Sequence, residues 1–406
     1  MNYREAVGWL FRTQRFGIKL GLESTHRLFD SLGVSALGAR ILHVAGTNGK
    51  GSVCAMLDSI CRAAGYRTAL FTSPHLISFR ERIQINGELI SDEAVGEGLT
   101  AIRALVADWA PHPTFFEITT ALALAYFRDA AVEIIVLETG MGGRLDSTNA
   151  TTPVVSILTP IDYDHQKWLG NSLTSIAGEK AGIIKAHVPV VSAGQPEEAA
   201  AVITARAREC EAPLTFVRET FTRFPVALLG SHQKQNAALA VAALAAAGIA
   251  CDDAALERGL TTVSWPGRFQ PWNERTIIDG AHNPAGARSL VKTWREIFGE
   301  QKATVILAIL ADKALPEICA ALAPITGRAL LPHIRSDRAA DPVELEAIAR
   351  KELPSVQTRI VPSFAEAWSQ AKRSPAPILI TGSLHFAGEA LAHLRGEPAA
   401  FEECLQ

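Results

Sequence analysis

Short, wholly apolar runs alternate along the first part of the chain with longer stretches in which apolar residues recur at helical spacing. These runs lack the polar alternation of a half-exposed strand, so they predict strands buried on both faces of a parallel sheet. Ser24 or Thr25 should lie near the cap of the second helix. The expected strands are 41–45, 67–72, 133–138, 154–159 and 188–192, and the expected helices are 4–14, 24–32, 53–64, 115–128, 173–184 and 233–247.

A break with Pro and Gly falls near 264–268, and a second alternation begins after it. We therefore expect a second, smaller α/β domain at about 270–406. Its expected strands are 276–279, 303–310, 328–331 and 378–380, and its expected helices are 284–298, 314–323, 342–351 and 363–372.

Composition narrows the class of protein. The chain has 406 residues, 48 % of them hydrophobic, which is enough to bury two cores. Its net charge of −3 gives no support for a surface that binds nucleic acid. The charged N-terminal segment is not a signal peptide, and no segment approaches a membrane helix. None of the six cysteines forms a CxxC pair, as expected of a reduced, intracellular protein.

The loop 46–52, GTNGKGS, lies between an expected strand and an expected helix. Glycine-exposed N–H groups at a helix N-terminus bind phosphate, and Lys50 would reach its terminal oxygens. The match to the general P-loop is imperfect, because Val44 stands where the first Gly belongs and the hydroxyl of Ser52 comes one place late. The alternative is a glycine-rich turn without a ligand.

Oxygen- and nitrogen-bearing side chains follow three of the strands. Ser73 lies in TSPHL, Glu138 ends a strand, and Asp164-His165 follows another. Ligands bind at the carboxyl ends of strands in such sheets, and magnesium prefers oxygen. The alternatives are a proline turn, a capping Glu and a structural His.

The remaining polar stretches are less specific. In the second domain, 279–284 (DGAHNP) crowds Asp, His and Asn at a strand end, and 381–383 (TGS) repeats that placement more weakly. The stretch 80–82 offers cations for an anionic substrate, although such charges are usually only solvated. Lys180 of EKAG could equally belong to an ordinary Glu–Lys pair on a helix.

The order of these motifs carries a resemblance. From about residue 3 to residue 390 the chain resembles the folylpolyglutamate synthase/dihydrofolate synthase family of the Mur ligase superfamily. The motifs are IKLGLE, HVAGTNGKGS, TSPHL, ERIQING, FFEITT, ETGMGGRLDSTN, DHQKWLG, EKAGIIK, GSHQKQNAALA, WPGRFQ, DGAHNP, DK and TGSLHFAGE. The family shares both departures of the loop from the general P-loop.

The resemblance implies an N-terminal P-loop-type parallel-sheet ATPase domain over 1–265, a linker over 266–270 and a Rossmann-like glutamate-ligase domain over 271–406. It also implies an ATP- and Mg²⁺-dependent ligase that adds L-glutamate to dihydropteroate, tetrahydrofolate or both through an acyl phosphate. Both activities together are our preference. The expected protein is a cytoplasmic monomer that binds small molecules, but neither nucleic acid nor membrane.

Residue roles follow from the same resemblance. Lys50, Lys180 and His282 are the expected catalytic residues, and Lys180 matches a lysine that the family often carries as a carbamate. The other expected groups are Thr47, Asn48, Gly49, Lys50, Gly51, Ser52, Asn236, Arg268 and Asp279 for ATP; Ser73, Glu138 and His165 for two Mg²⁺ ions; Arg82, His282 and Ser383 for glutamate; and Gly21, Leu22, Leu145 and Asp146 for the pterin. Position 385 is His where some relatives carry Tyr, which leaves detail on the glutamate side open.

Three rival interpretations were weighed. A peptidoglycan-precursor ligase would carry a uridine-nucleotide domain before the loop, and only 45 residues precede Gly46. A P-loop kinase or NTPase leaves DGAHNP and TGS unexplained. A catalytically silent binding protein is disfavoured because Lys50, Glu138, His165 and His282 are all present.

Overall fold

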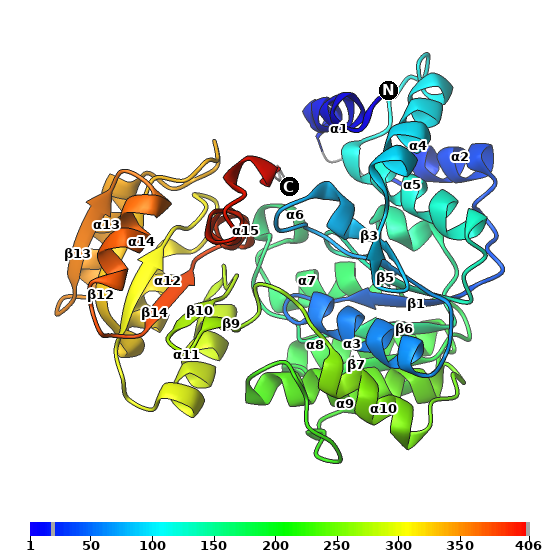
Figure 1. Cartoon of the computed structure of the whole chain (residues 1–406). Coiled ribbons are helices and arrows are strands. Elements are labelled where there is room, and N and C mark those ends of the chain that lie inside the picture. Colours follow the sequence, from blue (N-terminus) through cyan, green and yellow to red (C-terminus); the bar gives the residue numbers. More distant parts are fainter. Residues whose placement is uncertain (18–20, 403–406) are drawn as a thin grey trace.

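The structure is a computed structural model, and it describes residues 1–17 and 21–402. In Figure 1 a first α/β domain, coloured blue to green, lies beside a second one, coloured yellow to red. The fold class expected from the sequence is thereby confirmed.

The first domain is built on a sheet of eight strands in the order β4-β3-β2-β5-β1-β6-β7-β8. The strands from β2 to β8 in this order run parallel, and β3 and β4 add a short antiparallel edge. The strands are β1 (Arg40–Ala45), β2 (Thr68–Phe71), β3 (Ile83–Ile85), β4 (Glu88–Leu89), β5 (Ile134–Glu138), β6 (Val155–Leu158), β7 (Val190–Ala193) and β8 (Leu214–Val217).

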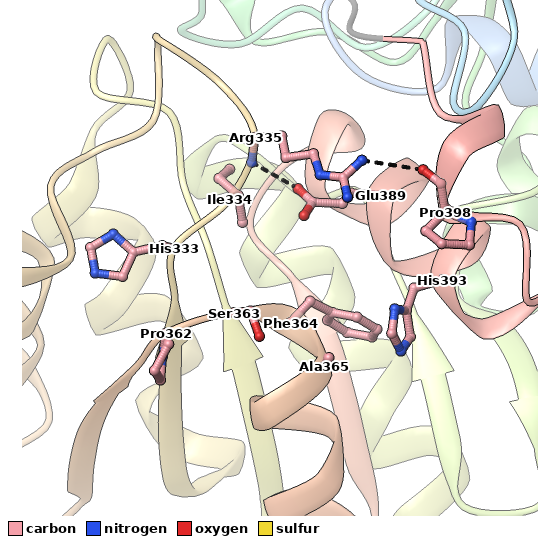
Figure 2. Close-up of a pocket in the computed structure, with 10 residues that line it drawn as sticks. All are labelled: His333, Ile334, Arg335, Pro362, Ser363, Phe364, Ala365, Glu389, His393 and Pro398. Carbon is pink, nitrogen blue, oxygen red and sulfur yellow. Dashed lines mark hydrogen bonds between the residues drawn. The ribbon is translucent and has the colours of Figure 1, made fainter.

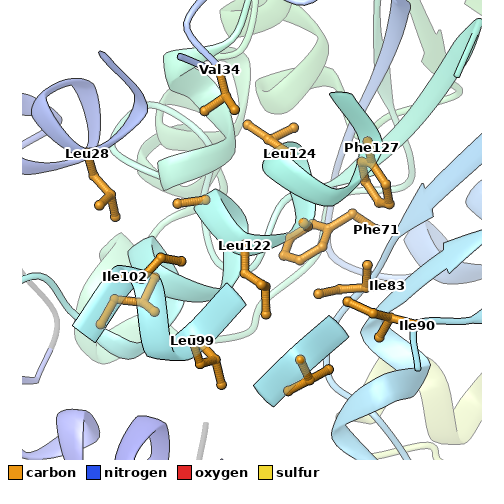
Figure 3. Close-up of a cluster of buried hydrophobic side chains, with 14 of the residues drawn as sticks. Leu28, Val34, Phe71, Ile83, Ile90, Leu99, Ile102, Leu122, Leu124 and Phe127 are labelled. Carbon is orange, nitrogen blue, oxygen red and sulfur yellow. The ribbon is translucent and has the colours of Figure 1, made fainter. Parts of the chain in front are cut away.

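Helices cover both faces of this sheet. One face packs against α1, α2, α4 and α5 (Figure 3), and the other against α3, α9 and α10, while α7 and α8 cover the β6–β7 side. The helices are α1 (Tyr3–Arg12), α2 (Glu23–Leu32), α3 (Lys50–Ala63), α4 (Asp92–Leu105), α5 (Phe115–Asp129), α6 (Gln166–Leu169), α7 (Leu173–Ala181), α8 (Glu197–Glu209), α9 (Ser231–Ala246) and α10 (Asp253–Thr262).

Strand β5 shows why the strands carry no polar alternation. Ile135 and Leu137 belong to the core on one face of the sheet, and Ile134 and Val136 to the core on the other. All four side chains are at most 1 % exposed. Each contributes about 1.5–3 kcal/mol of burial free energy, so apolar residues are favoured at all four positions before Glu138.

The second domain is built on six strands in the order β13-β12-β11-β14-β10-β9, parallel except for the antiparallel edge strand β9. The strands are β9 (Gln270–Asn273), β10 (Thr276–Ile278), β11 (Ala303–Leu307), β12 (Thr326–Pro332), β13 (Gln357–Val361) and β14 (Ile378–Thr381). The helices are α11 (Pro284–Phe298), α12 (Leu315–Leu322), α13 (Pro342–Glu352), α14 (Phe364–Lys372) and α15 (Leu384–Leu394).

The two domains share packing. Leu76 and Ile77, from the loop after β2, belong to the same buried cluster as residues of α14 and α15. A side chain at Gly388 of α15 would meet the carbonyl oxygen of Leu76 at 1.8 Å, so only glycine allows this approach. The carboxyl edge of the first sheet is therefore held against the second domain.

Two local expectations need correction. Helix α3 begins at Lys50, three residues before the expected start, so the last three residues of the glycine-rich segment 46–52 are already helical. Helix α2 begins at Glu23, and Leu22 precedes it without a side-chain cap. Ser24 and Thr25 therefore lie inside the helix, where the Thr25 hydroxyl donates to Glu117 Oε1 at 3.0 Å.

Candidate functional site

The segment between β1 and α3 forms a backbone cradle at the carboxyl edge of the first sheet. Gly46 and Gly49 have φ of 148° and 88°, which side chains rarely adopt. The amides of Thr47 and Asn48 donate to the Pro160 carbonyl and so anchor the cradle to the segment after β6. No side chain caps α3, which leaves its first amide groups for an anion.

Two lysines converge on this cradle. Lys50 Nζ donates to the carbonyls of Gly46 and Thr47 at 3.3 and 3.5 Å. Lys180, at the end of α7 and only 4 % exposed, donates to the same Gly46 carbonyl at 2.8 Å. Burial, and then the charge of Lys50, lower the pKa of Lys180 from 10.5 to about 7. A neutral amine at Lys180 is thus accessible near neutral pH.

Helix α9 supplies the wall beside the cradle. A side chain at Gly49 would come within 2.8 Å of Asn236 Oδ1, so Asn236 lies directly against the loop. Asn236 donates to Gln233 Oε1 at 2.9 Å, and Gln233 donates to the Ser52 hydroxyl at 3.3 Å. Gly51 approaches the Trp265 indole in the same way. The structure therefore places Asn236 beside the loop.

A buried carboxylate faces the lysines from β5. Glu138 is 3 % exposed and accepts from the Ser73 amide at 3.1 Å, which joins two of the three expected metal ligands. Burial raises the pKa of Glu138, while Lys50, the Ser73 amide, Arg268 and Arg82 oppose that rise. A carboxylate is the kind of oxygen ligand that a hard divalent cation prefers.

The third expected metal ligand, His165, lies before the short helix α6. Its φ is 51°, and its amide donates to Asp164 Oδ1 at 2.8 Å. Partial burial lowers the pKa of His165 to about 4, and Lys313, Lys50 and Lys180 act in the same direction against Asp164. A neutral imidazole, which can ligate a metal, is therefore favoured.

Among residues 1–17 and 21–402, no three His, Cys, Asp or Glu side chains gather in an arrangement that would hold a metal. The expected set contains only two such residues, so other oxygen ligands would have to complete the coordination. Ser73 and nucleotide phosphates are oxygen ligands of that kind.

Residues of the linker and the second domain close the site from the other side. Asp279 Oδ2 accepts from the Phe269 amide at 2.7 Å and Oδ1 accepts from the Ala281 amide at 2.8 Å, so Asp279 shapes the turn that carries Arg268. Burial lowers the pKa of Arg268, while Asp279 and Glu138 oppose that effect. Arg268 thus lies within electrostatic reach of a carboxylate of the first domain.

Asp164, of the first domain, contacts three residues of the second domain through its carboxylate. Its carboxylate accepts from Lys313 Nζ at 2.7 Å and from Asn283 Nδ2 at 3.2 Å, and His282 Nε2 lies 3.5 Å from it. Burial raises the pKa of Asp164, but His282, His165 and Lys313 outweigh burial and hold that pKa well below its usual range. Asn283 also donates to Asn48 Oδ1 at 3.0 Å.

Asp164 and Lys313 are not among the expected site residues, although Lys313 belongs to the DK motif. Both side chains are 8 % exposed. The sequence feature that pointed to this pair was the position of Asp164 beside His165 at the end of a strand. Its partner, Lys313, lies 149 residues further along the chain.

Arg82 lies deeper than the sequence suggested. Its side chain is fully buried, donates from Nε to His75 Nδ1 at 2.9 Å and stands 5.3 Å from the centre of the Phe115 ring. Ser383 precedes α15, and its hydroxyl accepts from the Phe386 amide at 3.0 Å. Ser383 is therefore at least a helix cap.

The four residues expected near the pterin have local roles. Asp146 accepts from the amides of Gly140 and Met141, both at 2.9 Å, and burial raises its pKa. It shapes the loop that contains Leu145. Gly21 and Leu22 lead into α2, and the Gly21 φ of 131° marks a sharp turn there.

A separate pocket of about 330 Å³ lies in the second domain (Figure 2). Arg335 lines it, donating from its amide to Glu389 Oε2 at 3.1 Å and from Nη1 to the Pro398 carbonyl at 3.2 Å. None of the expected site residues lines this pocket. The lining residues are His333, Ile334, Arg335, Pro362, Ser363, Phe364, Ala365, Glu389, His393 and Pro398.

The chain is similar to known protein families and to curated proteins. Residues 44–190 match the Mur ligase middle domain, and residues 267–384 match the Mur ligase, glutamate ligase domain. A dihydrofolate synthase/folylpolyglutamate synthase of Bacillus subtilis is 35 % identical over 97 % of this chain and 99 % of its own length.

Solved structures give the same result. The folylpolyglutamate synthase of Mycobacterium tuberculosis complexed with ADP and AMPPCP has a TM-score of 0.88 and 32 % identity, over 96 % of this chain and 99 % of its own. A bifunctional folylpolyglutamate synthase/dihydrofolate synthase with Mn, AMPPNP and L-glutamate bound has a TM-score of 0.86 and 30 % identity, over 96 % of this chain and 98 % of its own.

Proposed function

This chain belongs to the folylpolyglutamate synthase/dihydrofolate synthase family and is an ATP-dependent ligase that joins glutamate to folates, and we propose that the cradle at Gly46–Ser52 is where it activates the folate carboxylate. The observation that carries this proposal is the convergence of Lys50, Glu138 and Lys180 on that cradle, with Arg268 facing it from the linker.

The reaction follows from charge. A carboxylate is a poor electrophile, so the γ-phosphoryl group of ATP is first transferred to it, giving an acyl phosphate and ADP. The glutamate amine then attacks the acyl carbon, the amide forms, and phosphate and a proton leave. The transferring group carries spread negative charge, which Lys50, Arg268 and the first amides of α3 neutralise where it develops.

The ATP contacts proposed here are Thr47–Ser52, Asn236, Arg268 and Asp279. Their support is that the loop is anchored by Pro160 while Asn236 lies against Gly49. Arg268 and Asp279 join the first domain's cradle to the second domain through one turn. The nucleotide would therefore lie between the domains.

A divalent metal ion bound with the nucleotide would supply positive charge to the phosphate oxygens. We propose that Ser73, Glu138 and His165 hold two Mg²⁺ ions together with the phosphates. The buried carboxylate and the low pKa of His165 support this donor set.

We propose that Lys180 is carbamylated. Carbon dioxide adds to a neutral amine, and the carbamate nitrogen then loses a proton. The pKa of about 7 makes that neutral amine available, and the resulting anion would lie beside the lysine of the cradle. Lys180 would thereby act as an anion that supports the second metal ion.

On the glutamate side we propose His282, Arg82 and Ser383, and for the pterin the loops at Gly21–Leu22 and Leu145–Asp146. Asp164 holds His282 at the domain junction, which supports its position close to the cradle. The permanent positive charge of the Arg82 guanidinium is suited to a substrate carboxylate.

We propose further that the enzyme is a cytoplasmic monomer acting on small molecules alone, because its nearly balanced charge favours no polyanionic partner. The domains would divide at 1–265, 266–270 and 271–406, since α10 ends at Thr262 and β9 begins at Gln270. No helix of the described part of the chain has the length and apolar character needed to cross a membrane.

We propose that both dihydropteroate and tetrahydrofolate are substrates. The test is ADP release in the presence of Mg²⁺, measured with and without glutamate, with each carboxylate offered in a separate reaction. Glutamate-dependent release with both compounds would establish the bifunctional enzyme. Release with one compound alone would refute bifunctionality, and release with neither would refute the assigned substrates.

A further inference from the structure

The end of helix α7 is held by the loop that joins β5 to β6. The helix ends one residue after Lys180, and the last carbonyl groups of a helix have no partner within it. Here the β5–β6 loop supplies donors. The Arg144 amide donates to the Glu179 carbonyl at 2.7 Å. The Asn149 side chain donates to the Gly182 carbonyl at 3.1 Å. The segment that carries Lys180 is therefore attached to the first sheet through this loop.

The backbone of the β5–β6 loop also packs closely against the end of α7. A side chain at Gly143 would come within 2.8 Å of the Lys180 carbonyl oxygen and within 2.9 Å of the Glu179 carbonyl oxygen. On the other side of the contact, a side chain at Gly182 would clash with Arg144. Only glycine allows this approach at both positions. The loop therefore limits where α7 can lie, and with it the backbone from which the Lys180 side chain starts.

Asn149 is the side chain that joins the loop to the helix. It is 5 % exposed, and its Nδ2 donates to the Arg144 carbonyl at 3.0 Å as well as to the Gly182 carbonyl. A carbonyl can only accept, so the nitrogen of the amide must face both groups, and the orientation of the side chain is determined. Oδ1 of Asn149 is buried and accepts no hydrogen bond within the described residues. Asn149 thus acts through the two hydrogens of its amide nitrogen.

Asn149 is itself fixed in place. Its backbone amide donates to the Asp146 carbonyl at 2.8 Å, and its carbonyl accepts from Lys185 Nζ at 2.8 Å. The Asp146 carboxylate accepts from the Thr148 amide at 3.0 Å, and the Thr148 hydroxyl lies 2.8 Å from Nε2 of the buried His43. His43 belongs to β1, the strand that leads into the cradle. The loop that holds α7 is therefore anchored to the same strand as the cradle.

We propose that Asn149 is a positioning residue for Lys180, because its two hydrogen bonds hold the end of α7 where the Lys180 amine reaches the cradle. The inference rests on the proposed function, in which Lys180 acts in the reaction. Lys180 Nζ donates to the Gly46 carbonyl at 2.8 Å, and Gly182, which Asn149 binds, is two residues further along the chain. A misplacement of about 1 Å at a reacting centre can cost about 100-fold in rate.

The first test is the kinetics of Asn149→Leu, which nearly keeps the size of the side chain but cannot donate. ADP release is measured with Mg²⁺, with glutamate and the folate each varied in turn. We expect kcat to fall at least about tenfold, because Lys180 is displaced from the cradle. The KM for glutamate and the KM for the folate should change far less than kcat. Asn149→Ser is too short to reach both carbonyls, and it provides the same test if Asn149→Leu folds poorly.

A matched control separates positioning from general damage. The Thr151 hydroxyl donates to the Thr148 carbonyl at 2.8 Å, and both partners belong to the β5–β6 loop. Thr151→Val should therefore lower the melting temperature about as much as Asn149→Leu but leave kcat unchanged. Hydrogen exchange gives a readout that does not depend on activity. The amides of Ile183 and Ile184, which donate to carbonyls at the end of α7, should exchange faster in Asn149→Leu and not in Thr151→Val.

A double variant shows whether Asn149 acts through Lys180. In a Lys180→Met background, Asn149→Leu should have little further effect on kcat. If the effects of the two substitutions on kcat multiply, Asn149 acts by another route and the proposal is wrong. It is equally wrong if Thr151→Val lowers kcat as much as Asn149→Leu does, or if Asn149→Leu leaves hydrogen exchange at the end of α7 unchanged. If Lys180→Met itself keeps full turnover, the catalytic role of Lys180 fails first, and the positioning role falls with it.

Discussion

Single residues at this site owe their chemistry to burial. Lys180 shows this most clearly, because its amine has one carbonyl partner, a cationic neighbour and almost no solvent. The lack of solvent and the cationic neighbour both disfavour the charged ammonium, and one carbonyl partner does not offset them. A residue that the sequence presents as positive is thus prepared to be neutral at physiological pH, which no pattern of letters shows.

Replacing Lys180 with Met tests this at the level of stability, in buffer free of carbon dioxide. The folded-state pKa of about 7 lies below the ordinary 10.5, so between these values the unfolded chain binds a proton that the folded chain does not. The free energy of unfolding of the wild type should therefore rise with pH across this window, because keeping Lys180 unprotonated in the folded state becomes less costly. A shift of one pKa unit corresponds to about 1.4 kcal/mol. The free energy of unfolding of Lys180→Met, relative to that of the wild type, should therefore be roughly 3 kcal/mol larger at pH 6.5 than at pH 9.5. Denaturant unfolding at both values measures it, and equal differences would show that Lys180 stays charged.

Lys50 is expected to matter for turnover and not for folding. Lys50→Ala should reduce glutamate-dependent ADP release at least about 100-fold, because one centre of transition-state charge stabilisation is removed. The shape of the cradle comes from Gly46 and Gly49 and from the contacts to Pro160, so the melting temperature should change little. Substantial residual ligation by a folded variant would show that Lys50 is not the phosphate contact.

At the scale of elements, the helices and strands that were predicted are those whose apolar spacing is decided by two-sided burial, as in β5 and α5. Some of the elements that were not predicted depend on partners elsewhere in the fold. Strand β3 is a short strand paired to β2, β4 is paired to β3 at the edge of the sheet, and α10 packs against α3. The early start of α3 at Lys50 was missed because glycine usually ends helices.

The crossing of α3 and α10 gives a prediction about a glycine. A side chain at Gly259 would come within 2.5 Å of Ile60 Cα, which belongs to the backbone of α3. Gly259→Ala should therefore destabilise the fold by about 1–3 kcal/mol, as overpacking does. The matched control is Gly178→Ala in α7, where nothing lies within 4 Å and Ala should stabilise by up to about 1 kcal/mol. Denaturant unfolding of both variants measures the contrast, and equal effects would refute the steric argument.

At the scale of the whole molecule, motif order predicted which stretches gather at the domain junction. The loop at 46–52, Glu138, Lys180 and Arg268 do share one neighbourhood. What the sequence could not provide were the contacts between these stretches. Asp164 with Lys313 and His75 with Glu402 are separated by 149 and 327 residues, and only the packing of two domains brings them together.

The Asp164–Lys313 ion pair should therefore set how the domains sit together. Both side chains are 8 % exposed, and Lys313→Met would leave the buried carboxylate without its lysine partner, facing His282, Asn283 and the amide of His165. Loss of one partner of a buried pair costs roughly 3–5 kcal/mol, whereas an exposed pair contributes at most about 1 kcal/mol. Arg338→Met, which removes an exposed pair with Asp312, is the matched control.

Lys313→Met should thus lower both stability and ADP release, and its small-angle scattering profile should differ from that of the wild type. Adding Asp164→Asn should restore part of the lost stability, because no uncompensated charge then remains in the junction. If Lys313→Met costs no more than Arg338→Met and leaves the scattering profile unchanged, the ion pair does not hold the domains. Their relative position would then depend on the apolar contact of Leu76 and Ile77 with α15.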